Sequence, residues 1–284
     1  MTRLFGVIGD PIDHSLSPLI QGAALHALRL DALYAPFHVP LRDLAPMLRA
    51  LQLAGVEGLN VTVPLKEAVM PLLDRIDSSA KAIGAVNTIV MRHRRMIGYN
   101  TDGIGFSGAL RDLGWRPHPA HAVILGAGGA ARAVAWELSR VAGTRLTMAN
   151  RHLPRAQRLA RWLARRRPRV QIRAVSWHAV ALGEAELLVN ATTVGMRAAD
   201  GLPLSLRALQ PRTRVYDLVY HRETALVKAA RALGCVAANG ESMLLYQGAA
   251  SFQLWWHRPP PLEAMRQALM SALRRSREST VHHR

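Results

Sequence analysis

Residues 122–131 read Ala-Val-Ile-Leu-Gly-Ala-Gly-Gly-Ala-Ala, an apolar run that leads directly into a glycine-rich turn. The run is typical of a buried strand, and the residues after the turn, through Leu138, are typical of a helix. Gly126, Gly128 and Ala131 match the dinucleotide-binding fingerprint, with alanine in its third place. The stretch therefore predicts a Rossmann-type unit, and a purely structural glycine-rich turn is the alternative.

The second strand of such a unit ends, in NAD-binding proteins, at an acidic residue about 20 positions further on. In this chain Asn150, Arg151 and His152 stand there, and Arg155 follows in the next expected helix. A carboxylate would repel a 2′-phosphate, whereas guanidinium groups bind phosphate in a bidentate way. The pattern favours NADP over NAD. The alternative is that both arginines belong only to the arginine-rich surface of the helix expected over 154–166.

The composition is that of a folded protein with sizeable cores. Half of the 284 residues are hydrophobic and 20% are charged, which excludes intrinsic disorder, and the length suits two domains. No apolar run reaches the ~18–20 residues that span a bilayer, and no basic leader precedes an apolar core, so we expect neither membrane attachment nor export. The single cysteine, Cys235, excludes an intrachain disulfide and fits a cytoplasmic location.

The net charge of +18 raises a polyanionic partner as a second class of function. Most of the excess lies in residues 121–245, which carry 19 basic and 7 acidic side chains. A phosphorylated cofactor or a nucleic acid backbone would suit such a segment. The chain shows no zinc-ligand spacing and no RNA-binding aromatic motif, and only 5% of it is aromatic. We therefore expect no nucleic-acid partner.

Lysine is nearly absent from this chain. Of its 37 basic residues, only Lys66, Lys81 and Lys228 are lysine. Arginine cannot lose its proton in a protein, whereas lysine can. A lysine retained in an arginine-biased chain is therefore a candidate for proton transfer. We interpret Lys81 and Lys228 as chance, which leaves Lys66 as the candidate.

The first 120 residues alternate expected strands with expected helices, which predicts an α/β layer architecture. Four polar clusters interrupt the apolar surroundings there, each near the end of an expected strand, where α/β folds place ligands. The clusters are His14-Ser15-Leu16-Ser17-Pro18, Asn60-Val61-Thr62-Val63-Pro64-Leu65-Lys66, Gly84-Ala85-Val86-Asn87-Thr88 and Asn100-Thr101-Asp102-Gly103. Taken singly, each has a plain structural explanation as a helix cap, a turn or a surface residue.

Together, and in this order, the clusters resemble the motifs of the shikimate dehydrogenase family. Further matches are Gly126-Ala127-Gly128-Gly129-Ala130, the Asn150-Arg151 turn and Tyr246-Gln247-Gly248, so the resemblance covers nearly the whole chain. It implies two α/β domains, a mixed substrate-binding domain over 1–103, completed by C-terminal helices over 241–284, and a Rossmann-type NADP-binding domain over 104–240. It also implies the NADPH-dependent, reversible reduction of 3-dehydroshikimate to shikimate in aromatic amino acid biosynthesis.

The resemblance further implies roles for single residues. Lys66 and Asp102 would form the catalytic pair, in which the ammonium protonates the ketone oxygen during reduction and the carboxylate orients it. Ser15 and Ser17, helped by Tyr220, would bind the substrate carboxylate. The remaining substrate contacts would come from Asn60, Thr62, Asn87 and Gln247. The cofactor would lie against Gly126, Ala127, Gly128, Gly129, Ala130, Asn150, Arg151, His152, Arg155, Thr192, Val219, Gly240 and Met243.

Two positions depart from the family pattern. Many NADP-using members have threonine after the Asn-Arg pair, whereas this chain has His152. That ring either stacks on the adenine or reaches the 2′-phosphate, or it is simply exposed. After Gly240 the family continues Leu-Gly-Met, whereas here Glu241 and Ser242 precede Met243. We expect the extra carboxylate to alter cofactor affinity.

Two further functions stay open as alternatives. One is a quinate/shikimate dehydrogenase that uses NAD, and the other is a relative that binds NADP but acts on another hydroxy acid. The Ser-x-Ser motif and the pair of Arg151 and Arg155 argue against the first. No metal is expected, because His282 and His283 lack a third ligand in the sequence. We expect a monomer or a homodimer that binds only small molecules.

Overall fold

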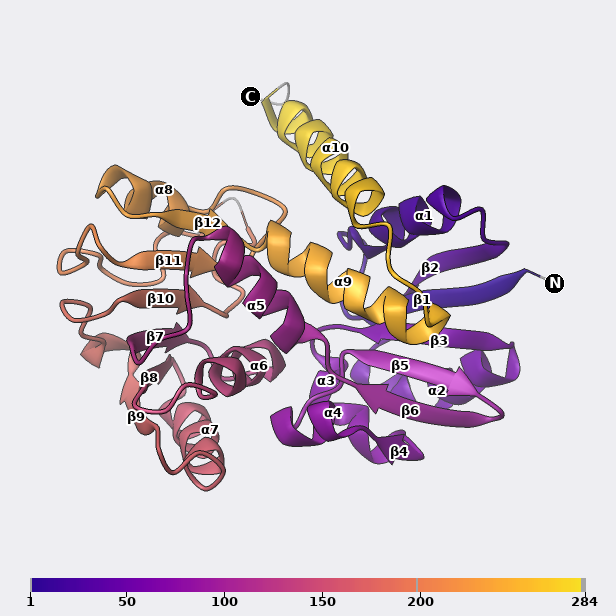
Figure 1. Cartoon of the computed structure of the whole chain (residues 1–284), viewed down its shortest axis with the longest axis horizontal. Coiled ribbons are helices and arrows are strands. Elements are labelled where there is room, and N and C mark those ends of the chain that lie inside the picture. The colour runs from indigo at the N-terminus through magenta and orange to yellow at the C-terminus, as the bar shows by residue number, and fades with distance from the viewer. Residues whose placement is uncertain (1, 198, 282–284) are drawn as a thin grey trace. The chain divides into compact units, whose positions relative to one another are not determined.

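The computed structural model describes residues 2–197 and 199–281 (Figure 1). They form two compact units, one built from the chain up to Gly105 and from Leu244 onward, the other from residues 106–243. His282 and His283, considered above as metal ligands, lie outside the described residues. Within the described ranges, no three His, Cys, Asp or Glu side chains gather as a metal site. No helix there has the length and apolar character needed to cross a membrane.

The first unit is built on a mixed sheet. Its strands are β1 (Arg3–Gly9), β2 (Ala32–His38), β3 (Val56–Val61), β4 (Arg75–Ile76), β5 (Thr88–Arg92) and β6 (Arg95–Tyr99). They lie in the order β2-β1-β3-β5-β6-β4. β2, β1 and β3 run parallel, β5 is antiparallel to β3 and to β6, and β4 is parallel to β6.

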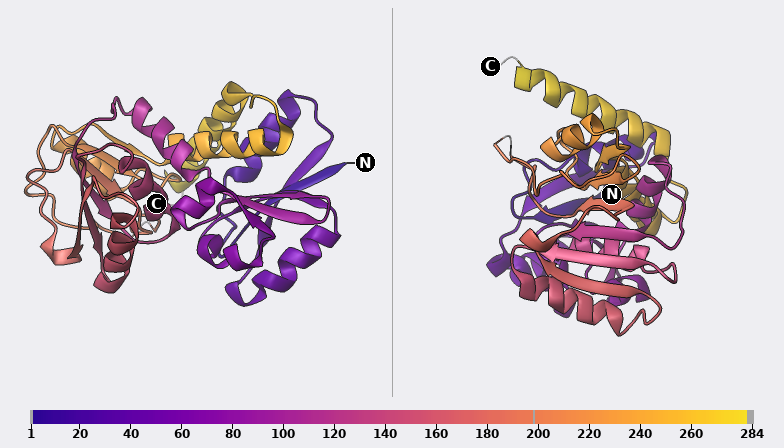
Figure 2. Two further views of the ribbon diagram at one scale, coloured as in Figure 1. Left: turned by 60° about the horizontal axis from the view of Figure 1, so that its bottom comes forward. Right: turned by 90° about the vertical axis from the view of Figure 1, so that its left-hand side faces the viewer.

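Helices pack on both faces of this sheet (Figure 2). They are α1 (Ser17–Ala27), α2 (Leu44–Leu53), α3 (Leu65–Ala68), α4 (Ser78–Ile83), α9 (Glu241–Trp256) and α10 (Leu262–Val281), with 3₁₀ turns η1 (Leu41–Asp43) and η2 (Met70–Leu72). Because successive strand residues point to opposite faces, Ile8 and Ile89 pack with α2 and α3. Phe5 and Val90 pack with Trp255 of α9 on the other face.

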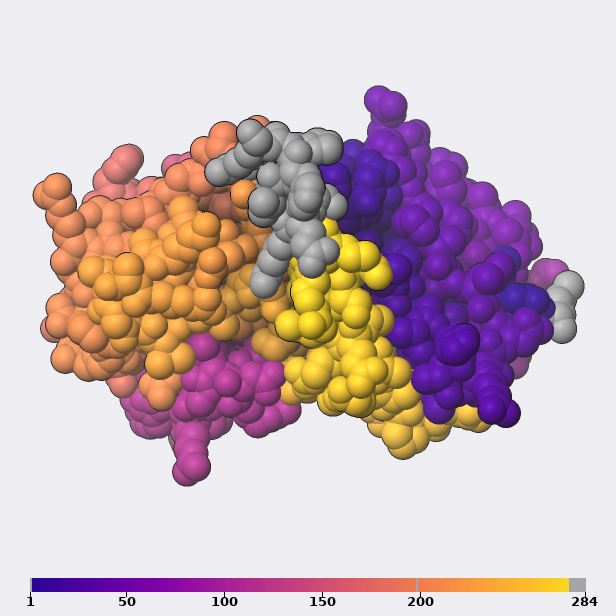
Figure 3. Space-filling view, turned by 90° about the horizontal axis from the view of Figure 1, so that it is seen from above, coloured from indigo at the N-terminus to yellow at the C-terminus, as the bar shows by residue number. Residues whose placement is uncertain are grey.

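α10 lies beside α1 on the surface of the first unit (Figure 3). Ile20 and Ala24 of α1 meet Met265 and Leu269 of α10 in one apolar cluster. The C-terminal segment thus completes the hydrophobic core of the unit that the N-terminal segment begins.

The second unit carries a sheet in which all strands are parallel. The strands are β7 (His121–Leu125), β8 (Arg145–Asn150), β9 (Gln171–Ser176), β10 (Leu187–Asn190), β11 (Arg214–Asp217) and β12 (Ala237–Asn239), in the order β12-β11-β10-β7-β8-β9. The helices are α5 (Asp102–Asp112), which starts in the first unit, α6 (Gly129–Leu138), α7 (Leu153–Ala164) and α8 (Ala225–Ala232), with the turn η3 (Trp177–Ala179).

Side chains of β7 show how this sheet is covered. Ala122 and Ile124 pack with α5, α6 and α7, whereas Val123 and Leu125 pack with α8 on the opposite face. The strand is therefore apolar from Ala122 to Leu125, as expected for a parallel strand buried on both sides. The two sheets confirm the predicted fold class, a mixed α/β sheet in one unit and a Rossmann-type sheet in the other.

The helix expected after Pro64 is shorter than predicted. The sequence pattern predicts a single helix over residues 66–73, but α3 ends at Ala68 and the chain continues as the 3₁₀ turn η2. Pro71 lies in that turn. Proline has no backbone N–H and its ring crowds the preceding turn, so the α-helix cannot run through it.

Gly58 on β3 lies directly under α9. The Trp255 side chain of α9 is 2% exposed, and its indole N–H donates to the carbonyl of Ile89 at 3.0 Å. A Cβ atom at Gly58 would overlap the indole ring. The close approach of helix and sheet therefore requires glycine at this position.

We expect Gly58→Ala to lower the free energy of unfolding by about 1–3 kcal/mol, because overpacking a dense core displaces its side chains. Gly22→Ala in α1 is the matched control, since no atom lies within 4 Å of its Cβ position. Alanine is favoured over glycine inside a helix by roughly 0.5–1 kcal/mol. Urea unfolding of both variants checks this, and equal stability of the two would contradict the packing argument.

Candidate active site

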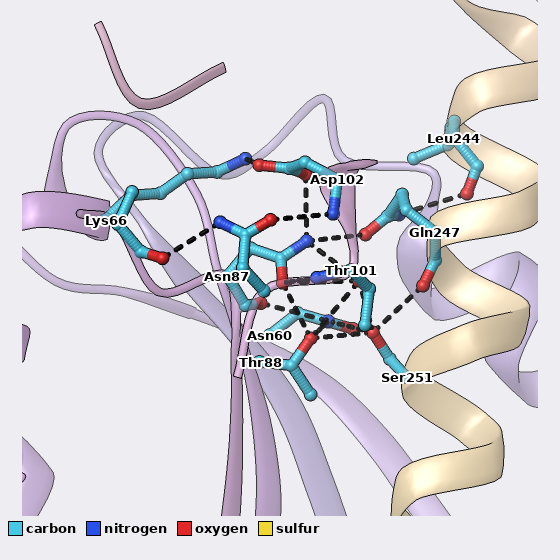
Figure 4. A network of polar contacts seen from close by, with 11 residues as sticks. Asn60, Lys66, Asn87, Thr88, Thr101, Asp102, Leu244, Gln247 and Ser251 are labelled. Atoms are coloured by element: carbon cyan, nitrogen blue, oxygen red, sulfur yellow. Dashed lines mark hydrogen bonds and ion pairs between the residues drawn. The ribbon is translucent and has the colours of Figure 1, made fainter. Parts of the chain in front are cut away.

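The first unit brings Lys66 and Asp102 together as an ion pair (Figure 4). Lys66 lies on α3, shortly after β3, and Asp102 is the first residue of α5. Lys66 Nζ donates to Asp102 Oδ2 at 2.6 Å, and the side chains are 14% and 4% exposed. A pair so shielded from water is screened little by salt.

Asn87 holds the other oxygen of the Asp102 carboxylate. Its Nδ2 donates to Asp102 Oδ1 at 2.8 Å and to Thr101 Oγ1 at 2.9 Å, with a longer contact to Gln247 Oε1 at 3.3 Å. Its Oδ1 accepts the backbone N–H of Thr101 at 2.8 Å. Reversing the amide would place N–H against N–H and oxygen against carboxylate, so these neighbours determine its orientation. Both carboxylate oxygens of Asp102 therefore have donors.

Asn60 is 5% exposed, and its amide is engaged within the protein. Its Oδ1 accepts the Tyr34 hydroxyl at 2.7 Å. Its Nδ2 donates to Ser251 Oγ at 2.9 Å and to the carbonyl of Asn87 at 3.2 Å. An amide nitrogen has two protons, and both have partners here. These bonds hold the Asn60 amide in place, and its contact with substrate stays a prediction.

Tyr34 is a site residue that sequence reasoning missed. It lies on β2 and belongs to none of the motifs quoted above. Burial raises the pKa of Tyr34 well above its ordinary value, against the lowering effect of a hydrogen bond with Ser17. The phenol therefore stays protonated and donates to Asn60. β2 and β3 both pair with β1, which brings Tyr34 and Asn60 close together. No local sequence pattern predicts this contact.

The predicted carboxylate contacts lie at the start of α1. Ser15 Oγ accepts the backbone N–H of Ser17 at 3.3 Å, and both serines are half-buried. Ser17 is the first residue of the helix, whose N-cap is Leu16. Thr62 is also half-buried, just past β3, and its N–H donates to the carbonyl of Ile8 at 2.9 Å.

In the second unit, the predicted cofactor residues lie past the carboxyl ends of neighbouring parallel strands. β7 and β10 are adjacent, and the strand order reverses between them, which is where open α/β sheets bind ligands. The residues follow β7 (126–130), β10 (Thr192), β11 (Val219) and β12 (Gly240), or lie at the end of β8 and just past it (150–152), with Arg155 on α7 and Met243 on α9.

The glycine-rich turn after β7 has space for a phosphate. Gly126 has φ +115°, which only glycine adopts readily, and a Cβ there would meet the carbonyl oxygen of Ala191. Gly128 is the N-cap of α6 and supplies no side-chain cap, and nothing lies within 4 Å of its Cβ position. The first N–H groups of α6 and the positive end of its dipole therefore face open space. Ala131 is fully buried, as close packing of helix and strand requires.

The end of β8 carries positive charge and no carboxylate. Asn150 ends the strand, and its Oδ1 accepts the backbone N–H of His152 at 2.8 Å. His152 is the N-cap of α7, and Arg151, His152 and Arg155 are all exposed. This set of donors fits a phosphate on the ribose better than a free hydroxyl.

Buried polar groups fix the loop of Thr192. Asn190 Oδ1 accepts Thr192 N–H at 3.1 Å and Thr192 Oγ1 at 2.7 Å, and Asn190 Nδ2 donates to Asp217 Oδ1 at 2.9 Å. Asp217 is fully buried and also accepts from Thr224 Oγ1 at 2.7 Å and Val219 N–H at 3.1 Å. Burial raises the pKa of Asp217, and these hydrogen bonds oppose the rise. This role of Asp217 was not predicted from the sequence.

The last predicted cofactor residues lie near β11 and β12. Gly240 N–H donates to the carbonyl of Val219 at 2.9 Å. Met243 is buried, and its N–H donates to the Tyr216 hydroxyl at 3.2 Å. Tyr220, predicted to help bind the substrate carboxylate, follows β11 in the second unit.

We expect the stability difference between wild type and Asp217→Asn to depend on pH. The folded-state pKa of Asp217 is raised above the usual 3.8, so its ionisation opposes folding and stability falls as pH rises through that window. Asparagine removes this proton while keeping one carbonyl acceptor. Between about pH 4 and the raised folded-state pKa, the free energy of unfolding of the variant should therefore rise relative to that of wild type. Thermal unfolding across pH measures this, and a constant difference would show that burial leaves the carboxyl unperturbed.

Two family models match this chain. Residues 7–89 match the shikimate dehydrogenase substrate binding domain, and residues 240–270 match the shikimate 5′-dehydrogenase C-terminal domain. The NADP(+)-dependent shikimate dehydrogenase of Rubrobacter xylanophilus is 45% identical over 271 residues, which cover 94% of this chain and 95% of that protein.

Solved structures are similar over the same extent. Shikimate 5-dehydrogenase from Thermus thermophilus, in complex with NADP(H) and shikimate, is 37% identical with a TM-score of 0.84, covering 95% of this chain and 100% of that chain. Quinate dehydrogenase from Corynebacterium glutamicum, in complex with NAD, is 33% identical with a TM-score of 0.86. The match covers 95% of this chain and 99% of that chain. With 45% identity to a curated relative over nearly its whole length, the chain belongs to the shikimate dehydrogenase family.

Proposed function

We propose that this protein catalyses the NADPH-dependent, reversible reduction of 3-dehydroshikimate to shikimate. The observation that carries the proposal is the shielded pair of Lys66 and Asp102, held by Asn87, in a chain of this family. The Thermus thermophilus relative is a complex with NADP(H) and shikimate, which supports the same ligands here. The first unit would bind the substrate and the second unit the cofactor.

The protein's own contribution is to stabilise charge and move one proton. NADPH, when bound, supplies the hydride for the ketone carbon. Lys66 then protonates the ketone oxygen, where negative charge develops, from its Nζ. Asp102 Oδ2 holds that ammonium at 2.6 Å, and Asn87 holds Oδ1 at 2.8 Å, so the donor has one orientation. In the reverse direction the neutral amine accepts the hydroxyl proton, which a guanidinium cannot do.

We assign the pyrophosphate to the turn over 126–130, whose N-cap glycine leaves the first N–H groups of α6 open. Arg151 and Arg155 would bind the 2′-phosphate, with Asn150 in place of the acidic residue of an NAD site. Thr192, Val219, Gly240 and Met243 would border the rest of the cofactor. The place of His152 against adenine, phosphate or solvent stays a prediction, as does the effect of Glu241.

For the substrate, Ser15 and Ser17 with Tyr220 would bind the carboxylate. The ring and its hydroxyls would contact Asn60, Thr62, Asn87 and Gln247. Ser15, Ser17 and Thr62 are half-buried, as suits groups that exchange water for ligand. A monomeric or homodimeric state and a cytoplasmic location also stay predictions.

A second candidate is an NAD-using quinate/shikimate dehydrogenase, which the similarity to the quinate dehydrogenase structure keeps open. The experiment is an initial-rate assay of purified protein with shikimate or quinate, each with NADP⁺ or NAD⁺. Turnover that is fastest with shikimate and NADP⁺ supports the proposal. Turnover confined to quinate or to NAD⁺ selects the alternative.

We expect Lys66→Ala and Lys66→Arg to lower kcat for shikimate oxidation by about 10²–10⁴-fold, the usual contribution of a positioned general acid–base. The arginine variant keeps a cation beside Asp102, so its loss reports the chemistry and not the fold. Lys81→Ala, on the exposed face of α4, is the lysine control and should retain full activity. A Lys66→Arg enzyme with wild-type kcat would remove Lys66 from proton transfer.

Cofactor choice should depend on the end of β8. We expect the double variant Arg151→Ala/Arg155→Ala to raise KM for NADP⁺ by roughly fivefold to tenfold, because exposed charge-assisted contacts are partly screened by water. KM for NAD⁺ should stay the same, since NAD⁺ lacks the 2′-phosphate. Arg165→Ala, at the C-cap of the same helix, is the control. Equal weakening of both cofactors would place the two arginines outside the 2′-phosphate site.

A further inference from the structure

Ser251 lies on α9 and belongs to none of the motifs quoted above. Its side chain is fully buried, and its Oγ has four polar neighbours (Figure 4). It accepts from Asn60 Nδ2 at 2.9 Å, donates to the carbonyl of Gln247 at 3.0 Å, and lies 2.8 Å from Thr88 Oγ1 and 3.2 Å from Thr101 Oγ1. We call Thr88, Thr101 and Ser251 the hydroxyl triad.

The number of protons limits how the hydroxyl triad can hydrogen-bond. Each hydroxyl has one proton and two acceptor positions. Ser251 directs its proton to its own helix at Gln247, so its oxygen accepts from Asn60 and from one threonine. The threonine hydroxyls lie 3.4 Å from each other, and Asn87 Oδ1 lies 2.9 Å from Thr88 Oγ1 and 3.2 Å from Thr101 Oγ1. Ser251 thus offers the threonine protons an acceptor in addition to Asn87 Oδ1.

The triad meets the candidate catalytic pair through Asn87. The oxygen of that amide faces the triad and the backbone of Thr101, and its nitrogen faces Asp102 at 2.8 Å. Asp102 in turn holds Lys66 at 2.6 Å. All these groups lie in the first unit, so the whole chain of contacts belongs to one compact body.

We propose that Ser251 is a positioning residue for the proton-transfer pair, acting from α9 through the hydroxyl triad and Asn87 on the Asp102 carboxylate. The inference rests on the proposed function and deepens it. Ser251 is not a catalytic residue, because three side chains stand between it and the lysine. Its effect is to keep the Asn87 amide, and with it the Lys66 ammonium, in one orientation.

The test compares variants that remove the hydroxyl with and without removing volume. Ser251→Ala removes the hydroxyl and its volume. Ser251→Cys keeps a side chain of similar size, but its thiol hydrogen-bonds only weakly. We expect both to lower kcat for shikimate oxidation by about tenfold, less than the ~100-fold that a 1 Å misplacement can cost. KM for shikimate and for NADP⁺ should stay within about twofold of wild type, since no ligand contact is lost.

Ser139→Ala is the matched control. Ser139 is a buried serine at the end of α6, and its Oγ donates to a carbonyl of its own helix, that of Trp136, at 2.6 Å. Like Ser251, Ser139 donates to a backbone carbonyl of its own helix, but it is not part of the hydroxyl triad. The kcat of Ser139→Ala should therefore equal that of wild type. Thr101→Val removes a second member of the triad at nearly constant volume, and adding Ser251→Ala to it should lower kcat by less than tenfold, because both act on one network.

Several results would overturn the proposal. They are a wild-type kcat in Ser251→Cys, a loss that falls on KM, a matching loss in Ser139→Ala, and independent effects of Ser251→Ala and Thr101→Val. Thermal unfolding accompanies each assay, and if the alanine variant does not fold, the cysteine variant decides. Failure of the proposed function looks different, since wild type itself would then not turn over shikimate with NADP⁺.

Discussion

A carboxylate withdrawn from water must be paired and hydrogen-bonded, and the first unit is arranged around that requirement at Asp102. One oxygen meets Lys66 and the other meets Asn87, at 2.6 and 2.8 Å. Removing either partner would leave a buried charge unmet, so the three side chains act together. The surrounding amides and hydroxyls follow from the same need, because each donor that serves the carboxylate must itself be held in place.

The charged groups of the second unit that are proposed to bind a ligand are positive and exposed, in contrast to the buried carboxylate of Asp102. The predicted ligand of the second unit is a polyanion, and the groups proposed to bind it are exposed arginines and the N-terminus of α6, which no side chain caps. The buried acid of this unit, Asp217, has no cation among its hydrogen-bond partners, and burial raises its pKa accordingly. It serves the backbone of the loops after β10 and β11. Two buried carboxylates in one chain thus have different surroundings and different tasks.

The sequence was sufficient for features whose chemistry is local. The turn after β7 can be predicted because its tight geometry requires glycine within a few residues. The rarity of lysine draws attention to Lys66, whose role in proton transfer stays a prediction. Tyr34 and Ser251 could not be found in this way. Tyr34 reaches a residue 26 positions away, and Ser251 reaches one 191 positions away. Such contacts depend on strand order and helix packing, which no short pattern encodes.

The distribution of charge connects both units to one reaction. Residues 121–245 carry 19 basic and 7 acidic side chains. The pair of Lys66 and Asp102 in the first unit instead has neutral amides and hydroxyls as its neighbours. Attraction of a phosphorylated cofactor acts over a distance and tolerates arginine, whose charge is permanent. Proton transfer needs a group that can change its charge, at a place where no other cation competes for the carboxylate. A chain in which 34 of 37 basic residues are arginine can meet both needs only if a lysine stands where the proton is proposed to move.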